Sequence, residues 1–60
     1  MVIKGRINGL IYIYEGNETH YSYSVYTDNR DYVQFIDRDG NPNPEFQIGD
    51  KITINVTKEA

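Results

Sequence analysis

The sequence contains no cysteine and no tryptophan, only two prolines and one histidine. Without cysteine, the chain has neither a disulfide framework nor a thiolate metal site, although short secreted domains usually carry such staples. No apolar run is long enough to cross a membrane as a helix, and the opening residues lack the apolar stretch of a signal peptide. We therefore expect a cytoplasmic protein that makes no contact with a membrane.

Positive charge is also scarce. Six Lys and Arg residues against nine Asp and Glu give a formal net charge of −3, with a pI near 4.8. This negative net charge argues against a protein that binds duplex DNA through phosphate contacts alone. It does not exclude a binder of single strands, because stacking on aromatic rings supplies much of that affinity. Aromatic residues are the abundant class, with six Tyr and two Phe.

The length of 60 residues allows one domain only. A domain of this size buries about 60% of the surface that its unfolded chain exposes, so its stability is marginal unless packing is tight or a partner contributes. No linker, repeat or low-complexity segment divides the chain. We expect a single domain over residues 1–60, and association of identical chains stays an open alternative.

Polarity alternates with a period of two along the whole chain, which is typical of β-strands, and no helical period occurs. The alternating segments are residues 2–14, 19–27, 31–37 and 51–58, separated by turns at 15–18 and 28–30 and by a proline-containing loop at 39–44. An open sheet this small would leave unpaired edges and a thin core. The pattern therefore predicts an all-β fold, a small five-stranded antiparallel barrel of OB-like type, with an SH3-like barrel as the alternative.

The first segment has two interpretations. Asn8-Gly9 between apolar runs is a strong hairpin signal, since both residues tolerate the positive φ of a type I′ turn. Alternatively, residues 2–14 form one strand that bends at Gly5 and Gly9. We favour the bent strand slightly, because it keeps every isoleucine on one face. The predicted core is then Ile3, Ile7, Ile11, Ile13, Tyr23, Val25, Val33, Phe35, Phe46, Ile48, Ile52, Ile54 and Val56.

No residue pattern indicates catalysis or a metal site. His20 is the single histidine, no serine or acid is tied to it by a motif, and a solvated strand residue is the simpler interpretation. Residues 37–41 contain Asp, Asn and Gly, but the glycine comes too early for an EF-hand and prolines follow it. Turn chemistry accounts for that composition. We predict that the chain is not an enzyme, has no catalytic residue, and needs no metal or other cofactor.

Four tyrosines form the candidate binding surface. On the parity of the bent strand, they fall on the face opposite the isoleucines, together with two cations of the first strand and one glutamine of the third. Exposed rings beside cations are the composition of a stacking platform for unpaired bases. Tyrosine pairs that merely brace the solvent side of a thin sheet give the same pattern. The candidate nucleic-acid-binding residues are Lys4, Arg6, Tyr12, Tyr14, Tyr26, Tyr32 and Gln34.

Several short segments, in order, resemble the cold-shock domain, the smallest OB-type barrel. Lys4-Gly5-Arg6-Ile7 is similar to its opening strand, and Tyr21-Ser22-Tyr23-Ser24-Val25 lies where its first RNA-binding motif alternates aromatic and small residues. Tyr32-Val33-Gln34-Phe35 is similar to its second motif, Phe-Val-His-Phe, and Gly49-Asp50-Lys51-Ile52 to the start of its fourth strand. The terminal residues 55–60 are similar to the tail of a bacterial cold-shock protein.

The resemblance implies a single-stranded nucleic-acid ligand, but it has departures. The family's tryptophan is missing, and Gln34 stands where the family has a stacking histidine. The family would place Tyr21 and Tyr23 on the ligand face, whereas hydrophobic parity places both inside with Val25. We follow the parity.

Three interpretations of the function remain. The first is a small module that binds single-stranded nucleic acid weakly and with little sequence preference. The second is an SH3-like protein-interaction module, or a small inhibitory or accessory protein, whose acidic surface meets a basic protein partner. The third is a designed or recombined scaffold without an evolved function. We adopt the first as the working prediction.

Overall fold

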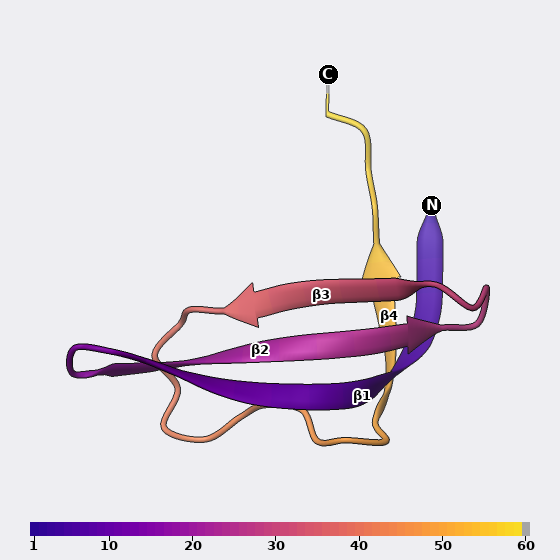
Figure 1. The fold of residues 1–60 in the computed structure, drawn as a ribbon. Helices are drawn as coiled ribbons and strands as arrows, with labels where there is room; N and C mark the ends of the chain where they lie inside the picture. Colours follow the sequence, from indigo (N-terminus) through magenta and orange to yellow (C-terminus); the bar gives the residue numbers. More distant parts are fainter. Residues whose placement is uncertain (60) are drawn as a thin grey trace.

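The structure is a computed structural model that describes residues 1–59. Its four strands form one antiparallel sheet in the order β3-β2-β1-β4 (Figure 1). The strands are β1 (Val2–Glu15), β2 (Glu18–Thr27), β3 (Tyr32–Asp37) and β4 (Lys51–Asn55). In the part of the chain that is described, no helix is long and apolar enough to cross a membrane.

The predicted all-β, antiparallel class is confirmed, whereas closure into a five-stranded barrel is not. The sheet stays open, and the described residues supply four strands rather than five. Residues 38–50, which lie between β3 and β4, form a loop with no strand of their own. Two prolines in that stretch remove backbone donors, so it cannot pair as a central strand.

Strand β1 is a central strand that pairs with both β2 and β4. Residues 2–6 of β1 pair with β4 and residues 5–15 pair with β2, so Gly5 and Arg6 have a partner on each side (Figure 1). One bent strand therefore replaces the alternative hairpin at Asn8-Gly9. The bend needs glycine at its corner, because a Cβ on Gly5 would lie 2.6 Å from the carbonyl oxygen of Tyr26 and 2.9 Å from Cγ1 of Val25.

A β-bulge at Asn8 reverses the side-chain parity of β1. Ile7 pairs with Val25, but the next pair along joins Gly9 to Ser24, so Asn8 is an extra residue. Beyond it, Leu10 and Tyr12 lie opposite the buried residues Tyr23 and Tyr21, on the core side of the sheet.

The bulge overturns part of the predicted core. Ile11 and Ile13 pair with Ser22 and His20 on the opposite side, which we call the outer face. Ile11 is 59% exposed there and Ile13 is half-buried. The prediction that every isoleucine of β1 lies inside is therefore wrong beyond residue 8.

The core lies on the other face of the sheet, under the loop of residues 38–50. Ile48 and Val56, which the alternation also placed in the core, are exposed because Ile48 stands just before the Gly49 turn and Val56 follows the end of β4. The fully buried apolar residues are Ile7, Tyr21, Tyr23 and Val25, packed against Leu10, Val33, Phe35, Phe46, Ile52 and Ile54.

Two buried tyrosine hydroxyls hold the loop against the sheet. The hydroxyl of Tyr23 accepts the backbone N–H groups of Glu45 at 3.0 Å and Phe46 at 3.4 Å. The hydroxyl of Tyr21 donates to the carbonyl oxygen of Asn41 at 3.0 Å. These bonds satisfy polar groups that would otherwise be costly to bury, and they let an irregular loop serve as the second layer of a thin domain.

Candidate nucleic-acid interface

One line of cross-strand pairs crosses all four strands on the outer face. Lys51 of β4 lies opposite Arg6 of β1, Arg6 lies opposite Tyr26 of β2, and Tyr26 lies opposite Tyr32 of β3. Directly paired residues of antiparallel strands direct their side chains to the same face. Two cations and two aromatic rings therefore stand in a row, and we call these four residues the cation–tyrosine row.

The two rings of the row form an edge-to-face pair. Their centroids are 5.0 Å apart with an interplanar angle of 65°, and Tyr26 and Tyr32 are 41% and 67% exposed. Edge-to-face packing restrains both rings and leaves a face of the more exposed ring, that of Tyr32, accessible. Beside the pair runs a shallow groove of about 500 Å³. Its lining residues are Arg6, Ile7, Asn8, Tyr26, Tyr32, Ile48 and Gly49.

The cations gather at the β4 end of the row. Lys4 lies opposite Thr53, and with Arg6 and Lys51 it lines a second hollow of about 330 Å³, into which Asp28 also faces. No carboxylate of residues 1–59 lies within 4.0 Å of any of these three cations. All three are exposed and available for phosphate contacts. Lys51 was absent from the predicted set, because only the pairing of β4 with β1 brings it beside Arg6.

Gln34 occupies the next line of the outer face. It pairs with Ser24, and its Nε2 donates to the Ser24 hydroxyl at 3.4 Å. The amide is exposed and retains a free oxygen and a second N–H, which are the groups that bond a base edge. Lys4, Arg6, Tyr26, Tyr32 and Gln34 of the predicted set therefore share one face.

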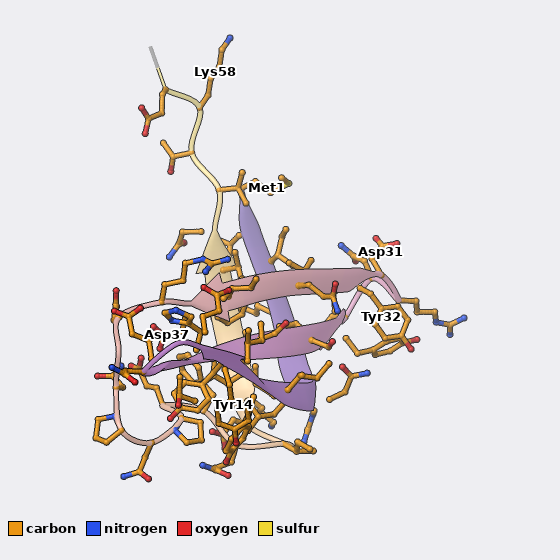
Figure 2. The ribbon with its side chains drawn as sticks, turned by 60° about the vertical axis from the view of Figure 1, so that its left-hand side comes forward. Met1, Tyr14, Asp31, Tyr32, Asp37 and Lys58 are labelled. Atoms are coloured by element: carbon orange, nitrogen blue, oxygen red, sulfur yellow. The ribbon has the colours of Figure 1, made fainter. Side chains whose placement is uncertain are left out.

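Tyr12 and Tyr14 do not belong to this face, and their predicted placement there is wrong. Tyr12 pairs with Tyr21, and their rings meet edge to face at 5.3 Å and 88°. Tyr14, two residues on, follows Tyr12 to the core side, where it is 74% exposed. Figure 2 shows Tyr14 below the sheet and Tyr32 at its right-hand end. The physical reason is the bulge at Asn8, which reverses every later side chain of β1.

Tyr21 and Tyr23 are enclosed, as hydrophobic parity predicted and contrary to the family resemblance. They are 2% and 0% exposed, so neither ring presents a face to a ligand. Burial raises the pKa of the Tyr21 phenol above its ordinary value, and the nearby phenols of Tyr12 and Tyr23 raise it further. These residues support the sheet and do not form part of the interface.

His20 is buried, so its predicted place as a solvated strand residue is wrong. It is 4% exposed, and its Nε2 lies 3.3 Å from a carboxylate oxygen of Glu18 and 3.7 Å from one of Glu15. Its Nδ1 is buried without a hydrogen-bond partner among the described residues. These two glutamates face each other across the β1–β2 turn, a pairing that the positions in the sequence alone do not reveal.

The acidic loop after β3 is an ordinary turn. The Asp37 carboxylate accepts the backbone N–H of Asp39 at 3.0 Å and the side-chain amide of Asn41 at 3.5 Å. Such self-contained bonding is characteristic of an Asx turn. Over residues 1–59 there is no group of three or more His, Cys, Asp or Glu side chains arranged to hold a metal ion.

Comparison with protein-family models, with curated proteins and with solved structures finds no match for this chain.

Proposed function

We propose that this protein is a small module that binds single-stranded nucleic acid weakly and with little sequence preference. Tyr26 and Tyr32 stack on unpaired bases, Gln34 bonds a base edge, and the cations Lys4, Arg6 and Lys51 contact phosphates. Stacking tolerates any base, because every base has a π-face, and this accounts for the low specificity.

The cation–tyrosine row is the observation that carries the proposal. Neighbouring strands lie about 4.8 Å apart, so the row extends over roughly 14 Å from Lys51 to Tyr32. It presents phosphate-binding groups at one end and rings at the other, in line across the sheet. A single strand laid along the row meets both kinds of group at once. The net charge of −3 does not oppose this arrangement, because among residues 1–59 no carboxylate, that of Asp28 included, lies within 4.0 Å of the three cations.

The fold is part of the proposal. We infer that the open sheet is a reduced OB-like barrel, related in form to the cold-shock domain, in which the loop of residues 38–50 takes the place of the missing strand. The bonds from Tyr23 to Glu45 and Phe46 support this view, since they close the core with a loop. The cytoplasmic location expected from the cysteine-free sequence belongs to the same proposal.

A salt titration tests the function. Binding of a fluorescent oligo-dT strand is measured by anisotropy at increasing salt, with a duplex of equal length as the control. We expect the single strand to bind more tightly than the duplex, with a log–log slope no steeper than about −2, since three phosphate contacts contribute roughly 0.7 each. Failure of the oligo-dT strand to bind at low salt would contradict the proposal.

The groove beside the two tyrosines favours a second candidate, an SH3-like module for a protein partner. Ile48 is 67% exposed and lines this groove together with Tyr26 and Tyr32. Exposed apolar and aromatic side chains at one place are typical of protein-binding surfaces. On this candidate, the acidic protein meets a basic peptide. An Ile48→Ala variant that loses a peptide ligand while oligo-dT binding is absent in the parent protein would establish it.

A further inference from the structure

The outer edge of β3 is free of backbone partners. The bond from the Thr27 N–H to the Asp31 carbonyl closes the β2–β3 turn at 2.9 Å. Hydrogen-bonded and non-hydrogen-bonded pairs alternate along an antiparallel ladder, so Val33 and Phe35 bond to β2. The backbone groups of Tyr32, Gln34 and Ile36 therefore point away from the sheet, and no backbone bond from residues 1–59 reaches them outside the ladder.

This edge lacks the features that keep a strand from pairing with another chain. Residues 32–37 contain no proline, no lysine and no bulge, and Asp37 is their single charge. Protected edges usually carry such features. By contrast, the other edge strand, β4, begins with Lys51 and is shorter. The β3 edge is thus the better template for a further strand.

The exposed surface of the chain is larger than that of a compact monomer of the same mass. The chain exposes 4808 Å². A compact monomer of 7.0 kDa would expose about 4040 Å², so the excess is about 770 Å². The free tail and the uncovered outer face both contribute to it. A standard interface buries about 800 Å² on each partner, so the excess is large enough for one.

We propose that two copies of this chain pair through their β3 edges into a continuous eight-stranded sheet. The pairing is antiparallel about a two-fold axis at Gln34, the central residue whose backbone points outward. This register places Gln34 opposite the second copy's Gln34 and Tyr32 opposite the second copy's Ile36 on the outer face. Val33 meets the second copy's Phe35 on the core side. The contact is self-complementary, as a closed two-fold interface requires.

The side chains suit this register. Ile36 and Tyr32 are 43% and 67% exposed in the single chain, and aromatic–β-branched pairs across strands are favourable. The register also brings like charges together twice, because Asp31 of each copy falls opposite Asp37 of the other copy. The dimer does not rest on nucleic-acid binding. Its axis stands perpendicular to the sheet, so both cation–tyrosine rows lie on the same side of the assembly.

A charge-substitution series measured by sedimentation velocity is the first test. The wild-type chain is expected to reach twice its 7.0 kDa mass as concentration rises. Gln34→Lys places two lysines against each other at the axis, and it should raise the dissociation constant several-fold while circular dichroism stays unchanged. Thr53→Lys adds the same charge to β4 and should leave the dimer intact. Asp31→Asn removes both repulsions and should tighten it. A wild-type chain that stays monomeric at every concentration, or equal effects of the two lysines, would overturn the dimer.

Cross-linking gives a second test, made clean by the absence of native cysteine. Hydrogen-bonded antiparallel pairs have Cα atoms about 5.5 Å apart, within the disulfide range of roughly 4.4–6.8 Å. Gln34→Cys should therefore form a covalent dimer quickly under mild oxidation, whereas Thr53→Cys should not. Cross-linking of both variants at the same slow rate would show that the β3 edges do not meet.

Discussion

Tyr23 holds Phe46 in two ways. Its hydroxyl accepts the Phe46 N–H at 3.4 Å, and its ring meets the Phe46 ring edge to face at a centroid distance of 5.4 Å. The same hydroxyl accepts the N–H of Glu45 at 3.0 Å. One side chain thus fills the core and satisfies the loop backbone that closes it, which a phenylalanine could do only in part.

Tyr23→Phe should therefore destabilise the fold by about 1–3 kcal/mol, the cost of leaving part-buried N–H groups without an acceptor. Urea unfolding, followed by circular dichroism, measures the loss. Tyr14→Phe removes a hydroxyl from a side chain that is 74% exposed, so it serves as the control and should change little. Equal stability of the two variants would show that Tyr23 does not hold the loop.

Gly5→Ala should destabilise the fold more than Gly9→Ala. A Cβ at Gly5 meets the Tyr26 carbonyl oxygen at 2.6 Å, and this backbone atom cannot move without breaking the sheet. A Cβ at Gly9 meets only the Ser24 side chain, at 3.2 Å. Overpacking of the first kind costs about 1–3 kcal/mol, and the matched unfolding curves should differ by this amount. If the two variants were equally stable, the β1 corner would not require glycine.

Alkaline pH should weaken the fold through Tyr21. Burial raises the pKa of this phenol in the folded chain, so above the ordinary tyrosine pKa the folded state holds a proton that the unfolded state has lost. The contribution of Tyr21 to the free energy of unfolding is therefore fully present below the ordinary tyrosine pKa. It is lost as pH rises through the pKa of the folded state. Urea midpoints between about pH 8 and about pH 11 measure the fall. Tyr21→Phe should flatten it, whereas Tyr32→Phe, on the outer face, should leave it in place.

Tyr32→Ala should weaken oligo-dT binding by about 1–3 kcal/mol, the range for losing one stacked base. Tyr32→Phe should bind almost normally, because the ring stacks without its hydroxyl. Tyr14→Ala is the matched control, since the bulge places this exposed ring on the core side. Oligo-dT titrations are made on variants that circular dichroism shows to be folded. They distinguish a Tyr32 ring that stacks on a base from one that only stabilises the sheet. A Tyr32→Ala protein with a lower melting temperature and an unchanged affinity would show that the ring only braces the sheet.

Lys51→Ala should make the salt dependence of binding shallower by about 0.7 in slope, one phosphate's share on a single strand. Lys58→Ala removes the same charge from the tail beyond β4 and should leave the slope unchanged. Anisotropy titrations over one salt series measure both variants. Equal slopes for Lys51→Ala and the parent protein would place Lys51 outside the site.

The strands and their turns could be predicted from the sequence, because alternation and turn chemistry are local properties. The inward placement of Tyr21 and Tyr23 followed from parity alone. The second half of β1 could not be assigned in this way, since Leu10, Ile11 and Tyr12 are consecutive apolar or aromatic residues and either parity gives a plausible core. The glycine beside Asn8 was a signal of the bulge, but the same dipeptide also signals a hairpin.

The candidate site could be predicted only in part, because local alternation does not reveal the bulge. Residues before the bulge, and those on β2 and β3, kept their assigned face, as Arg6 and Tyr26 show. Lys51 was missed because the pairing of the first and last strands is a long-range contact that no local pattern specifies. The burial of His20 could not be predicted either, because it depends on a cross-strand neighbour and two glutamates at the hairpin end.

The bulge at Asn8 determines which side chains of β1 face the core and which face solvent at the hairpin end. The number of residues in β1 therefore matters there as much as their identity. Deleting this one residue would exchange Leu10, Tyr12 and Tyr14 for Ile11 and Ile13 across the sheet without altering any of them. Point substitutions can change the two surfaces of the hairpin one position at a time. A single-codon insertion or deletion at position 8 would swap them at once.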